Sequence, residues 1–158
     1  MNMKYLIGSS LMAIGALGAG CAVSQTETAT GAPLARQVAQ SAHCGLTAPG
    51  HLLIGSAAQL VQLESLPART LSLQPLRDID FQREKVVLAA IGQKPTGGFG
   101  VTLQSSEIVD DTLNLTIRVT EPGPGTMVTQ VLTTPCAVIA VAAEGWSDIR
   151  ITRAENNR

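Results

Sequence analysis

The sequence predicts an α+β domain, mostly antiparallel β-sheet in a small sandwich or curved sheet with one helix packed on it, and three observations support this class. Several runs alternate apolar and polar residues with a period of two, which is typical of half-buried strands. Two unbroken apolar runs, at 86–91 and 136–143, are typical of strands buried on both faces. One segment, 57–66, has the spacing and the flanking residues of a helix.

The clearest alternation lies between residues 99 and 119. Apolar side chains occupy every second position in 99–103 and again in 113–119, and Asp110 and Asp111 lie between the two runs. Aspartate favours turns because its side chain bonds to nearby backbone groups. The stretch therefore predicts a β-hairpin with one buried face.

The segment after this hairpin is rich in proline and glycine. Residues 121–125 (Glu-Pro-Gly-Pro-Gly) can continue neither a helix nor a central strand, so they turn the chain. We expect a third strand at 127–132, a second turn at 133–135 and a fourth strand at 136–143. These four strands together are predicted to form a meander.

The helix at 57–66 is predicted from its capping residues and its apolar face. Ser56 and Gln59 have the spacing of a capping box, and Leu60, Leu63 and Leu66 share one helical face. The remaining chain gives shorter signals. Strands are expected at 35–41, 84–91 and 146–152, and residues 69–76 fit either a strand or a loop.

The N-terminus has the pattern of an export signal. Lys4 precedes an uncharged segment that ends in small residues before Cys21, and it is too short to span a bilayer comfortably. These residues resemble a bacterial lipobox, which implies a signal peptide at 1–20 and a lipidated Cys21. By the same resemblance, Ala22 in place of an aspartate favours the outer membrane, facing either the periplasm or the cell surface.

Composition divides the rest into a tether, one domain and a tail. Residues 21–34 carry one charge and little apolar surface, so we expect a flexible tether. Residues 35–152 suit one domain, and 153–158 form a polar tail. Without Lys4, ten Lys and Arg face twelve Asp and Glu, a net charge of −2 with no cationic cluster, which argues against nucleic-acid binding.

Three ordered motifs resemble the C-terminal domain of the PrcB family. They are Gly92-Gln93-Lys94-Pro95-Thr96-Gly97-Gly98-Phe99, then Glu121-Pro122-Gly123-Pro124-Gly125, then Gln130-Val131-Leu132-Thr133-Thr134-Pro135. The resemblance covers about 78–142, and Cys136 stands where the family has an aromatic such as Tyr. It implies an accessory subunit or stabiliser of an envelope protease, without a cofactor.

Few residues are suited to catalysis or metal binding. His43 and His51 are the two histidines, and neither lies in a nucleophile motif. Cys44 beside either histidine could act as a thiol nucleophile, but a loop histidine next to a structural cysteine is the interpretation we favour. Zinc held by the two histidines with Cys44 and Cys136 lacks compact ligand spacing. We expect no metal and no catalytic residue.

Cys44 and Cys136 are the cysteines that remain once Cys21 is acylated. Export places them in an oxidising compartment, so we expect them to form a disulfide. The replacement of the family's aromatic by Cys136 favours the same outcome. Two separate buried thiols are the alternative.

The turn Thr96-Gly97-Gly98-Phe99-Gly100 is the predicted partner-binding site. Its glycines leave bare backbone beside one large apolar side chain, which suits the docking of a strand or loop. The alternative is that Phe99 points into the core and the glycines only relieve crowding around it.

The sequence as a whole favours an envelope lipoprotein that binds or scaffolds another protein rather than an enzyme. Its expected partners are an envelope protein, such as a protease, and the membrane through the lipid anchor. The rival function is a small-ligand-binding or hydrolytic periplasmic domain with a pocket near Phe99 and Trp146. A deep apolar pocket with convergent polar groups would favour the rival, and a flat exposed strand edge would favour the protein-binding module.

Overall fold

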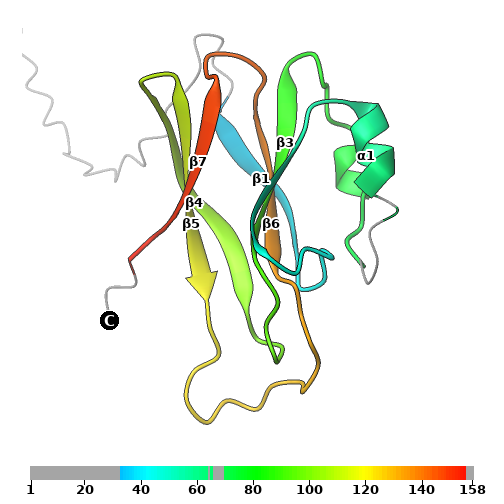
Figure 1. Ribbon diagram of the computed structural model, residues 1–158, viewed down its shortest axis with the longest axis vertical. Coiled ribbons are helices and arrows are strands. Elements are labelled where there is room, and N and C mark those ends of the chain that lie inside the picture. Colours follow the sequence, from blue (N-terminus) through cyan, green and yellow to red (C-terminus); the bar gives the residue numbers. More distant parts are fainter. Residues whose placement is uncertain (1–32, 64, 66–69, 156–158) are drawn as a thin grey trace, which may run out of the picture.

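The computed structural model describes residues 33–63, 65 and 70–155, which form two β-sheets and one short α-helix (Figure 1). One sheet has four strands in the order β1-β6-β3-β2, and the other has three in the order β4-β5-β7. The elements are β1 (Ala35–Ser41), β2 (Pro49–Ile54), α1 (Ala57–Leu63), the 3-10 turn η1 (Gln74–Leu76), β3 (Glu84–Ile91), β4 (Gly100–Val109), β5 (Thr112–Thr120), β6 (Cys136–Ala142) and β7 (Asp148–Arg153). The predicted class, mostly β-sheet with one helix, is confirmed at this level.

The four-stranded sheet forms the middle layer, with α1 on one face and the three-stranded sheet on the other (Figure 1). Its inner strands, β3 and β6, are buried on both faces, as their unbroken apolar runs predicted. The residues that face the α1 side are Val86, Leu88, Ala90, Cys136, Val138 and Ala140. Those that face the second sheet are Val87, Ala89, Ile91, Ala137, Ile139 and Val141.

The predicted hairpin is formed by β4 and β5. Asp110 and Asp111 both have positive φ, 49° and 57°, and they connect the strands in the backbone conformation that matches the twist of a two-residue hairpin turn. The apolar alternation of β5 becomes its buried face. The buried residues are Leu113, Leu115, Ile117 and Val119.

The four-stranded meander predicted for residues 99–143 is wrong. Residues 127–132 form no strand, and β6 does not continue the hairpin but lies between β1 and β3 in the other sheet. Residues 121–135 instead make a long loop that carries the chain from one sheet to the other (Figure 1). The backbone of this loop bonds to the β3–β4 turn rather than to a strand.

The strands at the two ends of the domain differ from expectation in detail. The predicted strand at 35–41 is β1, whereas β2 was not predicted at all. The last strand, predicted at 146–152, is β7, and it runs parallel to β5, with Thr112 opposite Asp148. The three-stranded sheet is therefore mixed, whereas all the strand pairs of the four-stranded sheet are antiparallel.

The helix begins as predicted. Gln59 donates its backbone N–H to the hydroxyl oxygen of Ser56 over 3.3 Å, and its side-chain oxygen accepts the N–H of Gly55 over 2.7 Å. Leu60 and Leu63 are buried against the sheet, while Leu66 lies outside the described residues, as do the predicted signal peptide and most of the tether. Among the described residues, no helix has both the length and the hydropathy needed to cross a bilayer.

Candidate protein-binding site

The predicted docking segment, Thr96–Gly100, connects β3 to β4 and is bonded to the long loop 121–135. Gly97 donates its N–H to the carbonyl of Thr129 over 2.9 Å. Thr133 is nearly fully buried, and its hydroxyl donates to the carbonyl of Thr96 over 2.8 Å. The turn and the loop therefore form one unit at the lower end of the sandwich in Figure 1.

Two of the three glycines in this turn are required by that loop. A Cβ on Gly97 would overlap the hydroxyl of Thr129. A Cβ on Gly98 would lie 2.9 Å from a methyl group of Val128, and the φ of Gly98 is +86°, which side chains rarely adopt. The backbone that we expected a partner to approach is thus contacted by the chain itself. Crowding accounts for both glycines, but it comes from the loop residues Val128 and Thr129 and not from Phe99, around which the alternative had placed it.

Phe99 lies half-buried at the edge of the core between the two sheets. The ammonium group of Lys94 is 5.5 Å from the centre of its ring, within the range of a cation–π contact. At Gly100 a Cβ would make ordinary contact with Thr120 at 3.7 Å, so space does not require a glycine there. Phe99 therefore leaves only part of its ring available to a partner.

The loop presents apolar side chains to solvent that the sequence analysis did not single out. Met127 is 97% exposed, Leu132 63% and Val131 49%. We call these three residues the loop surface. Since Gly97 and Thr96 bond to residues 129 and 133 of the same loop, the loop surface is carried by the segment that packs on the predicted turn. A sequence signal existed, because the Pro-Gly-Pro-Gly segment ends two residues before Met127.

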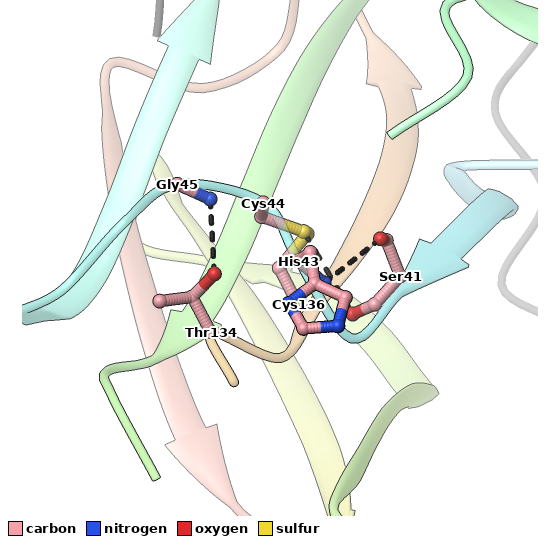
Figure 2. Close-up of a disulfide and its surroundings, with 6 residues drawn as sticks. All are labelled: Ser41, His43, Cys44, Gly45, Thr134 and Cys136. Carbon is pink, nitrogen blue, oxygen red and sulfur yellow. Dashed lines mark hydrogen bonds between the residues drawn. A yellow bond between two sulfur atoms is a disulfide. The ribbon is translucent and has the colours of Figure 1, made fainter. Parts of the chain in front are cut away.

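Cys44 and Cys136 are joined by a disulfide, with their Cα atoms 6.1 Å apart (Figure 2). Thr134 holds the same two segments together, because its carbonyl accepts the N–H of Cys44 over 3.0 Å and its hydroxyl accepts the N–H of Gly45 over 3.0 Å. Both cysteines are fully buried. The bridge fixes the segment after β1 to the start of β6.

This disulfide removes the thiol that the nucleophile and zinc alternatives required. In the bonded form neither Cys44 nor Cys136 has a thiolate to offer a substrate or a metal. His43 lies beside the bridge, and its backbone N–H donates to the Ser41 hydroxyl over 3.0 Å (Figure 2). His51 is exposed on β2. Within the described parts of the chain, no three His, Cys, Asp or Glu side chains are grouped to hold a metal ion.

A pocket shared by Phe99 and Trp146, as the rival function required, is not formed. Phe99 precedes β4 at one end of the sandwich, and Trp146 lies at the other, where Ser147 bonds to the hairpin residue Asp111. The ten residues of β4 between these ends span about 33 Å. The indole N–H of Trp146 donates to the carbonyl of Ala142 over 2.7 Å, and Lys85 lies 4.8 Å from its ring.

One cavity, of about 320 Å³, lies elsewhere, between α1 and the segment around η1. Its wall is apolar apart from Arg77. The lining residues are Ala57, Leu60, Val61, Leu73, Leu76, Arg77, Ile79 and Phe81. Binding sites for small ligands combine an apolar wall with several convergent polar groups, and this wall offers one guanidinium.

The comparisons with known proteins agree with the motifs noted in the sequence. The family model described as PrcB C-terminal matches residues 85–142, which run from β3 to β6 and include the turn, the long loop and Cys136. No curated protein and no solved structure matches the chain.

Proposed function

Because residues 85–142 match the family model described as PrcB C-terminal, we propose that the protein is a non-catalytic binding module of the bacterial envelope, an accessory subunit or stabiliser of a protease complex. The family match supports the association with a protease complex. The proposed partner is a protein rather than a small molecule or a nucleic acid.

The exposure of Met127 is the observation that carries the proposal. A methionine at 97% exposure covers no part of its own core, and Leu132 in the same loop is 63% exposed. Flexible, polarizable methionine side chains suit protein-binding surfaces because they adapt to the shape of a partner. We therefore place the contact on the loop surface and on the open side of Phe99, which modifies the docking site expected from Thr96–Gly100 alone.

The module is proposed to reach its partner from a lipid anchor. Acyl chains on Cys21 would hold it at the outer membrane, and the tether of 21–34 would let the domain move within roughly 20 Å of the head groups. The partner is then an envelope protein on the same membrane face.

Site-specific cross-linking in intact envelopes tests this function. A photoreactive residue at Met127 should give cross-links to a protease or its subunit, identified by mass spectrometry. The matched control is Val109, 47% exposed in β4 at the opposite end of the sandwich, which should give none of these products.

Two substitutions separate a binding residue from a core residue. Leu132→Asp should abolish the cross-links from Met127 with little change in thermal stability, because Leu132 is mostly exposed. Phe99→Ala should weaken the cross-links and also lower the free energy of unfolding, by about 2 kcal/mol for a half-buried ring. If Leu132→Asp leaves every cross-link intact, the loop surface is not the binding site. Turnover of envelope substrates by the purified chain alone would instead favour the enzymatic rival.

A further inference from the structure

The outer side of β2 has no neighbouring strand in the described structure. Five of its six residues are exposed, and only Ile54 is buried. The opposite outer strand of the same sheet is different, because β1 lies beside β4, where the side-chain oxygen of Gln37 accepts the N–H of Leu103 over 2.8 Å. An uncovered edge strand presents N–H and C=O groups to which another strand can bond.

The sequence of β2 also lacks the charges that usually protect such an edge. It reads Pro-Gly-His-Leu-Leu-Ile, with Leu52 and Leu53 each 38% exposed. The free edge of the second sheet, β7, carries Asp148, Arg150 and Arg153 within six residues. Charged side chains on an edge strand hinder its pairing with another chain, and β2 carries no Asp, Glu, Lys or Arg.

The hydrogen-bond pattern of the sheet decides which groups of β2 point outward. In an antiparallel sheet the backbone groups of successive residues bond alternately to the strand on one side and to the strand on the other. Ile91 donates its N–H to the carbonyl of Pro135, on the β6 side. The odd-numbered residues of β3 therefore bond to β6, and the even-numbered ones bond to β2. Gly50 lies opposite Ala90, and the even-numbered residues of β2 therefore bond inward. The groups of β2 that point outward are the N–H and C=O of His51, the N–H and C=O of Leu53, and the C=O of Pro49. Pro49 has no N–H.

We propose that two copies of this chain pair antiparallel through β2, with Leu52 opposite Leu52 of the second copy. In this register each His51 faces a Leu53 of the other copy, and every outward N–H and C=O of the two residues is paired. A register shifted by one pair would set the Leu53 carbonyl against Pro49 and Leu52 against Gly50, which loses a donor and a side-chain contact. A register shifted the other way would set His51 against Gly55, whose N–H already bonds to the Gln59 side chain over 2.7 Å. The self-complementary strand thus fits one two-fold arrangement.

The pairing joins two four-stranded sheets into one continuous sheet, but the strand is short. Six residues a side bury less area than the roughly 1,200 to 2,000 Å² of a stable interface. The dimer should therefore dissociate on dilution. It is independent of the loop surface, which lies on a different segment.

Cysteine cross-linking of the full chain in detergent-solubilised envelopes tests the register. Opposed residues of a non-hydrogen-bonded pair have Cβ atoms about 4.5 to 5.5 Å apart, close to the reach of a disulfide. Leu52→Cys should give a covalent dimer under mild oxidation. Leu53→Cys and the helix control Val61→Cys, 64% exposed, should give no more than the parent chain.

A charge variant tests the pairing without added thiols. Leu52→Lys places two lysines face to face and should shift the native mass from dimer to monomer, while Val61→Lys leaves the dimer intact. A cooperative thermal unfolding transition near that of the parent chain shows that each variant is folded. Three outcomes would each overturn the proposal. The parent chain could be monomeric at high concentration, Leu53→Cys could give as much covalent dimer as Leu52→Cys, or Leu52→Cys could cross-link only to other proteins.

Discussion

Thr133 and Lys94 exchange two backbone hydrogen bonds, of 2.8 and 2.9 Å, that hold the long β5–β6 loop against the β3–β4 turn. The next residue, Thr134, bonds to the opposite segment, donating its N–H to Ala42 over 2.7 Å and accepting that of Cys44. Successive residues of an extended chain point in opposite directions, so two adjacent threonines connect three distant segments. This is the physical role of the Thr133-Thr134-Pro135 motif in the matched region.

Thr133→Val should destabilise the domain. It removes the hydroxyl that donates to the Thr96 carbonyl over 2.8 Å and leaves that acceptor without its donor in a buried place, which costs about 1 to 3 kcal/mol. Urea unfolding measures the difference. Thr126→Val, in the exposed part of the same loop, is the control and should change stability by less than about 0.5 kcal/mol. Equal losses in both variants would show that the hydroxyl bond of Thr133 contributes nothing specific.

Gly98→Ala should cost about 1 to 3 kcal/mol, because alanine must adopt a φ of +86° and displace Val128. Gly123→Ala is the matched control in the same region. A Cβ there would lie 3.4 Å from the Thr126 hydroxyl, a contact that a side-chain rotation relieves. Thermal unfolding of both variants should separate them clearly, and a neutral Gly98→Ala would contradict the packing of the loop on the turn.

The bridge between Cys44 and Cys136 should make both thiols unreactive toward alkylating agents in denatured, unreduced protein. The two positions are 92 residues apart, and removing a native bridge costs about 2 to 5 kcal/mol. The double variant Cys44→Ala, Cys136→Ala should show a loss of this size. Alkylation of both cysteines before reduction would show that the bridge does not form.

Asp111→Gly should stabilise the hairpin by roughly 0.5 to 1 kcal/mol. Asp111 has a φ of 57°, which glycine adopts without a steric cost, and the hydrogen bonds that it accepts from Ser147 are to its backbone carbonyl. Asp111→Val should instead lose about 1 to 2 kcal/mol, because a β-branched residue is strained at positive φ. Measured in the same unfolding assay, the free energy of unfolding should rise for Asp111→Gly and fall for Asp111→Val.

Cys21→Ser should release the protein from the membrane fraction or mislocalise it. The lipid anchor expected from the small residues before Cys21 would be lost, while the folded domain begins well after it. Fractionation of cells and mass spectrometry of the mature N-terminus measure this. A mature chain that starts elsewhere and carries an unmodified Cys21 would rule the anchor out.

The sequence predicted the elements that a local pattern determines. The runs of β3 and β6 and the capping residues of α1 act over a few residues, so they were recognisable. The neighbours of β6 in the sheet could not be predicted, because an apolar run indicates that a strand is buried but does not indicate which strands lie beside it. β2 was missed since its Pro49-Gly50 start resembles a turn and its exposed residues do not alternate.

The candidate site shows the same limit. Three glycines around one aromatic were interpreted as open backbone, yet Gly97 and Gly98 are packed by residues 128–129, at least thirty positions away. Such long-range contacts leave no local signal. The apolar residues of 127–132 were assigned to a strand for the same reason, although Met127 and Leu132 point to solvent.

The place of β6 between β1 and β3 has a consequence for the order in which the chain folds. β1 is an early strand, but its partner in the sheet begins about a hundred residues later, at Cys136. Contacts of such high sequence separation slow folding. Until β6 inserts, β1 and β3 both expose unpaired edges to chaperones and to aggregation. Formation of the Cys44–Cys136 disulfide, with an added oxidant such as oxidised glutathione taking up the two electrons and two protons, should then follow insertion of β6. The rate at which free thiols disappear during refolding with this oxidant therefore reports when the sheet closes.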